Sequence, residues 1–206
     1  MIAMEMEKAP RGRPRRLDKE KILEIASNLF WQQGYEATSI NELVTAMGIT
    51  PPSLYAAYSS KEELYLAAID RYSASYGRQM LSGLALHSCV YEALRTVLYE
   101  CVEVFVGGDH PSGCMISTGL VESSNAQGAL ARKLADLRQQ TVQIIADKFK
   151  SCETQFVEGT DLQALASFFG ATIQGMAVQA RDVNCPTELH KIADHSLSVL
   201  QACRRF

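Results

Sequence analysis

The chain has 206 residues, 47% of them hydrophobic and 21% charged, and its formal net charge is −3. These values are typical of a compact folded protein. The sequence has neither an apolar run of membrane-spanning length nor a signal peptide, so we expect a cytoplasmic protein with no membrane partner. The six cysteines form no CxxC pair and have no regular spacing, so we expect neither a zinc ribbon nor a disulfide framework.

The first 16 residues form a basic segment, which we expect to be a flexible arm. Its sequence PRGRP matches the core of an AT-hook, a motif that places arginines in the narrow minor groove of A·T-rich DNA. We therefore interpret Arg11, Arg13 and Arg15 as DNA contacts. Residues 8–21 carry a net charge of +5, although the whole chain is acidic. An ordinary disordered basic tail explains the same residues, and either arm adds salt-dependent affinity for nucleic acid.

A strong amphipathic helix is predicted from Asp18 to Gln33, ended by Gly34. Its apolar residues recur at helical spacing, and they are Ile22, Ile25, Ala26, Leu29 and Phe30. We expect this helix to be the scaffold on which two shorter helices pack.

Residues 39–61 predict a helix-turn-helix, a motif that reads duplex DNA. Ser39 and Glu42 have the spacing of a capping box, which starts a helix near Ile40. Gly48 stands where a left-handed residue ends that helix, and Ile49 follows as the apolar residue that packs under the turn. The motif therefore begins with a short helix and a sharp turn.

The second helix of the motif begins after Thr50, which we expect to cap it. Two prolines follow, in the first turn, where backbone amides have no intrahelical partner. Leu54 and Tyr58 are expected to face inward. The open face then carries short side chains that let the backbone approach base edges, and these are Thr50, Pro52, Ser53 and Ala56. Tyr55 and Lys61 are suited to phosphate oxygens.

A short helical hairpin in any helical protein has the same outline, so the flanking residues matter. Ser60 and Glu63 form a second capping box, which starts a long helix through Tyr72. A helix of this length can join a small head to a larger body. Together with the scaffold helix, it favours the DNA-binding interpretation.

The stretch LFWQQGYEATSINELVTAMGITPPSLYAAYSSKEELY resembles the DNA-binding head of the TetR/AcrR family of bacterial transcriptional repressors, over about residues 17–70. The resemblance rests on anchors in register, namely Leu29-Phe30, Gly34-Tyr35, Thr38, Ala46-Met47-Gly48-Ile49, Leu54-Tyr55, Tyr58 and Ser60-Lys61-Glu62. It implies phosphate contacts from Thr38, Tyr55 and Lys61, and base contacts from the face between Thr50 and Ala56. The DNA-binding residues of the motif are then Thr38, Thr50, Pro51, Pro52, Ser53, Tyr55, Ala56, Tyr58 and Lys61. Many members carry Tyr or His where this chain has Ala56 and Ala57, and Gly or Ala in place of Pro52.

Beyond residue 77 the sequence predicts helices separated by short breaks, without strand alternation, so the expected fold class is all-α. The predicted helices cover residues 90–106, 112–122, 126–152, 161–183 and 187–204. We divide the chain into an arm (1–16), a helix-turn-helix domain (17–62) and a helical effector-binding and dimerisation domain (63–206). By the resemblance, the last two helices pair with those of a second copy, and this homodimer reads a palindromic operator with half-sites about 34 Å apart. The alternative is that these helices only close the core of the monomer.

An effector pocket is expected among the central helices. Its candidate lining residues are Tyr91, Leu94, Leu98, Phe105, Met115, Leu137 and Phe149, although plain core packing explains the same residues. Near His110, Ser112 is expected to cap a helix with Cys114 in its first turn, where a helix N-terminus stabilises a thiolate. Cys114 is thus the first candidate for a sensor of electrophiles or oxidants, and a small buried residue is the alternative.

Other functions have weaker support in the sequence. Metal sensing would use His87 with Cys89, His110 with Cys114, or Cys185 with His190, but no pair has convincing ligand spacing, so we expect no metal and no cofactor. An enzyme would need Cys114 as nucleophile and His110 as base, without an orienting carboxylate. A non-inducible architectural binder of A·T-rich DNA is the remaining alternative. We predict a ligand-responsive DNA-binding regulator, more often repressor than activator, and not an enzyme.

Overall fold

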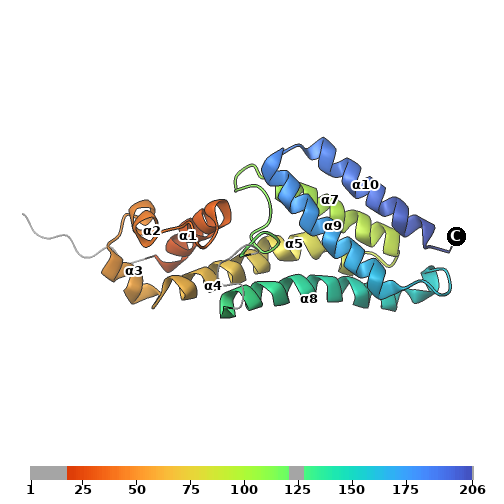
Figure 1. Cartoon of the computed structure of the whole chain (residues 1–206), viewed down its shortest axis with the longest axis horizontal. Coiled ribbons are helices and arrows are strands. Elements are labelled where there is room, and N and C mark those ends of the chain that lie inside the picture. Colours follow the sequence, from red (N-terminus) through yellow and green to blue (C-terminus); the bar gives the residue numbers. More distant parts are fainter. Residues whose placement is uncertain (1–17, 121–127, 206) are drawn as a thin grey trace, which may run out of the picture.

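The computed structural model describes residues 18–120 and 128–205, and every regular element in these ranges is a helix. The all-α prediction is confirmed. Three short helices form a head at one end of the elongated molecule, and long helices form the body at the other end (Figure 1). The basic arm, with Arg11, Arg13 and Arg15, lies outside the described residues.

The head is built by local sequence signals. Helix α1 (Lys19–Gln33) starts at Asp18, whose carboxylate accepts hydrogen bonds from two amides of the first turn, and it ends at Gly34. Helix α2 (Ile40–Met47) starts with the complete capping box, because Ser39 and Glu42 each accept a hydrogen bond from the other's backbone amide. Both starts agree with the sequence.

The turn between α2 and α3 (Pro51–Ala57) also agrees. Gly48 adopts a left-handed conformation with φ of 65°, and the amide of Ile49 donates to the carbonyl of Val44 at 3.0 Å. The expected side-chain cap at Thr50 is wrong, because its hydroxyl is hydrogen bonded to the hydroxyl of Ser53 at 3.0 Å instead. The prolines remove amides that a cap would otherwise satisfy, so α3 starts without one.

One nearly continuous helical rod joins the head to the body. Helix α4 (Lys61–Tyr72) starts at Ser60, whose hydroxyl accepts from the amide of Glu63, while the carboxylate of Glu63 accepts from Ser59 rather than from Ser60. The rod continues through a π-helical turn, η1 (Ser73–Gly77), then α5 (Arg78–Leu81) and α6 (Gly83–Leu86). The π-helical turn thus lies where the rod passes from the head into the body (Figure 1).

The body packs α7 (Val90–Val106), α8 (Ala129–Ser151), α9 (Leu162–Asp182) and α10 (Pro186–Ala202), with a short 3-10 turn, η2 (Glu153–Gln155), between α8 and α9. Helices α8 and α9 cross closely at Gly170, where an added Cβ would lie 2.5 Å from a Val142 methyl. Helix α10 packs on α7 and α9.

The helix predicted over residues 112–122 is wrong, because residues 112–120 form turns. Gly113 has a φ of 82°, and its amide donates back to the carbonyl of Phe105 at 2.7 Å, which folds the chain against the end of α7. Leu120 also has a positive φ, of 52°. Ser112 consequently caps no helix, and its hydroxyl donates to the carbonyl of Val106.

Candidate DNA-binding surface and effector cavity

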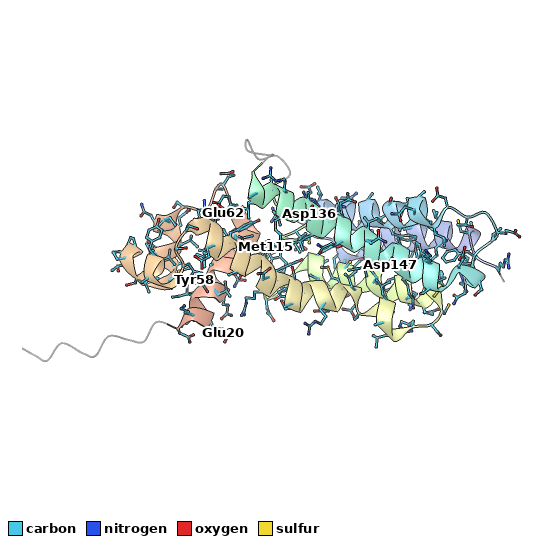
Figure 2. The ribbon with its side chains drawn as sticks, turned by 90° about the horizontal axis from the view of Figure 1, so that it is seen from below. Glu20, Tyr58, Glu62, Met115, Asp136 and Asp147 are labelled. Carbon is cyan, nitrogen blue, oxygen red and sulfur yellow. The ribbon has the colours of Figure 1, made fainter. Side chains whose placement is uncertain are left out.

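The face of α3 that the sequence predicts as the DNA-contact surface is mostly exposed to solvent. Leu54 is buried and holds the helix to the head core, whereas most of the other predicted contact residues of the motif are exposed. The exposed members are Thr50, Pro51, Pro52, Tyr55 and Ala56, and Ser53 is half-buried. Tyr58, expected to face inward, is half-buried at the C-terminal end of α3, which lies at the end of the molecule far from the body (Figure 2).

Lys61 starts α4 beside this surface, and its ammonium lies 4.3 Å from the centre of the Tyr35 ring. Partial burial lowers the pKa of the Lys61 amine, and the carboxylates of Glu36 and Glu42 raise it. Tyr35 in turn contacts Phe30 and Tyr65. The sequence did not identify Tyr35 as the support of Lys61, because the two residues are brought together only by the packing of α1 against α4.

Thr38 is fully buried, with an exposure of 0%. Its hydroxyl donates to the carbonyl of Gly34 at 2.7 Å, and so closes the loop between α1 and α2. In this structure the Thr38 side chain therefore stabilises the loop, and its hydroxyl does not face solvent as a phosphate contact would require.

An aromatic cluster fixes the head to the body. The Trp31 ring of α1 lies edge-on to Tyr72 and Tyr76 of the rod, and it stacks on His110 with 4.6 Å between ring centres. Its indole N–H donates to the carbonyl of Gly113 at 3.3 Å, and the guanidinium of Arg181 in α9 donates to its backbone carbonyl. Met115, in the same loop, lies at this junction (Figure 2). We call the contact between α1, η1 and loop 107–120 the head-body junction.

The body contains an apolar cavity of about 60 Å³, enclosed by the rod, α7, α8, α9 and loop 107–120. The lining residues are Gly77, Met80, Leu81, Cys101, Cys114, Ile116, Ser117, Arg138, Thr141, Gly170, Ile173 and Gln174. Among the described residues of this wall, Arg138 is the one with a charged side chain, and the sequence did not single it out. Leu134 precedes Arg138 by four residues and Val142 follows it by four, so Arg138 stands on the apolar stripe of α8. A charged residue on an apolar stripe is the sequence signal that could have identified it.

Only Cys114, among the predicted effector residues, lines this cavity. Leu98, Phe105 and Phe149 are fully buried core residues, and Tyr91 is half-buried beneath the guanidinium of Arg204. His110 and Met115 line a separate depression at the head-body junction. These residues do not line this cavity, and the sequence could not show it, because side chains that face the core and side chains that face the cavity have the same apolar character.

The thiol of Cys114 is buried and accepts a hydrogen bond from the amide of Ser117 at 3.3 Å. Cys101 lies on the same cavity wall, and burial raises the pKa of its thiol well above the ordinary value. Burial also raises the pKa of Tyr72 well above its ordinary value, and Cys114 adds to this effect. All six cysteines are free thiols in this structure. His110 does not share the cavity wall with Cys114.

Within residues 18–120 and 128–205, no three histidine, cysteine or acidic side chains gather as a metal site would require. Over the same part of the chain, no helix is both long enough and apolar enough to cross a bilayer.

Comparison with known proteins agrees with this arrangement. Residues 22–68 match the family model described as bacterial regulatory proteins, tetR family. The chain is 32% identical over 194 residues to the HTH-type transcriptional repressor ComR of Escherichia coli, covering 92% of each chain, and 33% identical over 120 residues to the repressor BdcR of the same organism, covering 58% of this chain and 60% of BdcR. A solved cysteine mutant of the TetR-family regulator CifR, in complex with 26-base-pair operator DNA, has a TM-score of 0.82 and 29% identity, over 91% of this chain and 98% of CifR. The protein therefore belongs to the TetR family of bacterial transcriptional regulators.

Proposed function

We propose that the protein is a homodimeric repressor that binds a palindromic operator in the cytoplasm and is released by a small-molecule or thiol-reactive effector. The observation that carries this proposal is the exposed first turn of α3. Thr50, Pro51 and Pro52 present only short or compact side chains there, while buried Leu54 fixes the helix to the head. A recognition helix with this profile brings its backbone close to base edges in the major groove.

Around this face, Tyr55 and Lys61 are assigned to phosphates. Tyr55 is 47% exposed, and Lys61 is positioned by its contact with the Tyr35 ring. Phosphate contacts of this kind fix register and orientation on the duplex, and they make binding salt-dependent. The basic arm adds further positive charge, which we assign to an adjacent minor groove.

Dimerisation is assigned to α9 and α10. Four large apolar side chains are exposed on or beside these helices, and they are Phe168, Val178, Val183 and Val199. A shallow groove between α9 and α10 has apolar and polar walls, and its lining residues are Phe168, Gln179, Glu188, Lys191, Ile192, His195, Ser196 and Val199. A face that exposes large apolar side chains among polar ones suits a two-fold interface, and two heads then gain affinity from two half-sites.

We assign release from the operator to motion of the helical rod formed by α4, η1, α5 and α6. The cavity wall includes Gly77 at the end of the π-helical turn, and Tyr76 in the same turn contacts Trp31 of the head. Mid-helix π turns often mark functional sites. An effector that displaces η1 would therefore shift α4 and the spacing of the two heads. Coupling of about 1–3 kcal/mol already changes operator occupancy severalfold or more.

The first test is selection of bound sequences from a random duplex pool, with untreated protein and with protein exposed to a mild peroxide or electrophile. A palindrome recovered only from untreated protein supports the thiol-reactive effector, and Cys114→Ser should then bind under both conditions, while Cys203→Ser, distant from the cavity, should behave as the wild type. The same palindrome in both samples supports the small-molecule effector. Absence of any preferred sequence contradicts the repressor and favours the architectural binder.

The dimer is tested by sedimentation. Val199→Asp places a charge on the exposed face of α10 and should yield monomers with weaker operator binding. Ile144→Asp is the matched control, because Ile144 is similarly exposed, at 44% against 40%, but lies on α8. Dissociation by both variants or by neither contradicts the assignment of this face.

A further inference from the structure

Arg138 is the unusual feature of the cavity. Its side chain is half-buried, and no described Asp or Glu lies within the 4 Å of an ion pair. One guanidinium nitrogen, Nη1, donates to the carbonyls of Ile116 at 2.9 Å and Gly119 at 3.1 Å. Burial lowers the pKa of this guanidinium, so its charge is held at a cost that an anion would offset.

The rest of the wall is mainly apolar. Met80, Leu81 and Ile173 form hydrocarbon or thioether surface, and Thr141 and Gln174 are the largest uncharged polar side chains. A volume of 60 Å³ is well above the about 10–15 Å³ that a single water needs, but it is small for an organic ligand. The cavity therefore suits a molecule with a short apolar body and one charged end.

We propose that the cavity binds a short-chain carboxylate, with its carboxylate on Arg138 and its hydrocarbon part against Ile173, Met80 and Leu81. A guanidinium pairs with a carboxylate through two parallel hydrogen bonds, which gives both affinity and orientation. Inorganic phosphate is also a small anion, but it would leave the apolar wall uncovered. The inference names the effector class, and it rests on the proposed function only for its effect on DNA.

Arg138 also connects the cavity to the head. The Gly119 backbone, which accepts from Arg138, is packed so tightly that an added Cβ would lie 3.1 Å from the hydroxyl oxygen of Tyr65 and 2.5 Å from the carbonyl of Met115. Tyr65 stands on α4 and packs edge-on against Phe30 of α1, with 4.9 Å between ring centres. A carboxylate that draws the guanidinium away from Gly119 would loosen this loop directly beneath the head.

Binding can be measured without DNA. Trp31 is the chain's only tryptophan, and its N–H donates to the carbonyl of Gly113, next to cavity residue Cys114. We would titrate the full chain with sodium butyrate at constant ionic strength, following Trp31 fluorescence and the melting temperature. Butyramide, which has the same size but no charge, sodium octanoate, which is too long, and sodium phosphate are titrated in parallel. Butyrate should bind at least about tenfold more tightly than each of them, because butyramide lacks the charge that pairs with Arg138, octanoate exceeds the cavity, and phosphate leaves the apolar wall uncovered.

Variants separate charge from structure. Arg138→Gln should abolish the preference for butyrate over butyramide, and Arg138→Lys should retain part of it. Because Arg138→Gln also removes support from the loop, Ile173→Phe serves as a second variant, which fills the cavity, leaves Arg138 in place and should prevent butyrate binding. Equal binding of butyrate and butyramide, tighter binding of phosphate, no binding of butyrate, or unchanged butyrate binding in Arg138→Gln would each overturn the carboxylate proposal.

The effect on DNA is then measured with the palindrome from the selection experiment. Butyrate should weaken operator binding by the wild type and have no effect on Arg138→Gln. If butyrate binds but leaves operator affinity unchanged, the carboxylate site stands and its role as effector site is wrong. If the protein selects no operator while butyrate binding and its loss in Arg138→Gln persist, the proposed function fails and the ligand class is supported.

Discussion

Gly113→Ala should destabilise the protein by about 3 kcal/mol. The φ of Gly113 is 82°, in the left-handed region, where a non-glycine residue loses about 1 kcal/mol. The new Cβ would lie 3.0 Å from the Ala177 carbonyl and 2.8 Å from Cγ of Arg181. Arg181 cannot move aside freely because its guanidinium donates to the Trp31 carbonyl, so overpacking adds about 2 kcal/mol.

Gly159→Ala provides the control. Its φ of 83° matches that of Gly113, but an added Cβ there has no neighbouring atom within 4 Å, so only the backbone cost of about 1 kcal/mol applies. For a chain of this length the difference of about 2 kcal/mol corresponds to about 4–8 °C in melting temperature, measured by circular dichroism at fixed protein concentration. Equal losses in the two variants would refute the argument that Gly113 is required by its contacts with α9.

Further outcomes follow from the head. Ser39→Ala should cost about 1 kcal/mol of unfolding free energy at any pH, because its hydroxyl accepts from the amide of Glu42. The backbone amide of Ser39 lowers the pKa of Glu42, so the contribution of this carboxylate is present above the ordinary carboxyl pKa and is lost as the pH falls through the lowered value. Glu42→Gln should therefore weaken the acid-side loss of stability, and an unchanged acid-side loss would argue against the capping box. Burial raises the pKa of Tyr65 to about 12, so the contribution of the neutral phenol to the free energy of unfolding is complete below pH 10 and is lost as the pH rises toward 12. Tyr65→Phe should therefore flatten the alkaline decline in the free energy of unfolding, measured in urea. Lys61→Gln should weaken binding to all DNA sequences and reduce the slope of log affinity against log salt by about 1, and an unaltered slope would remove Lys61 from the phosphate contacts.

The head could be predicted because its signals are local. The capping box of Ser39 and Glu42, the left-handed Gly48 and the proline start of α3 each involve residues within a few positions of one another. Such signals fix helix boundaries whatever the rest of the chain does. The cap predicted at Thr50 is wrong, and the cause is also local, because the hydroxyl of Thr50 is hydrogen bonded to the hydroxyl of Ser53 three residues later.

Loop 107–120 could not be predicted, because distant residues decide its path. The carbonyl of Gly113 accepts from the indole of Trp31, 82 residues earlier in the chain, and its amide donates to Phe105. Glycine at 113 and serine at 112 suggest a helix start when only neighbours are considered. The contacts with α1 and α7 override that preference.

The cavity was only partly predictable. The apolar and aromatic residues predicted for the pocket include Phe105 and Phe149, which fill the core, and of the predicted residues only Cys114 lies in the cavity wall. Arg138 was detectable from its place between Leu134 and Val142, but the sequence does not show whether such an arginine extends to solvent or lines a cavity. The answer depends on how closely α8 and α9 approach each other.

That approach links the cavity to the evolution of the bundle. Gly170 lies on the cavity wall and also against the methyl of Val142, at a distance that admits no side chain, so these two positions cannot change independently. A relative with alanine at the position of Gly170 needs a smaller residue than valine opposite it, and the paired exchange reshapes the cavity wall. Cavity shape and helix packing are therefore inherited together, and natural variation should appear as covariation between the two positions.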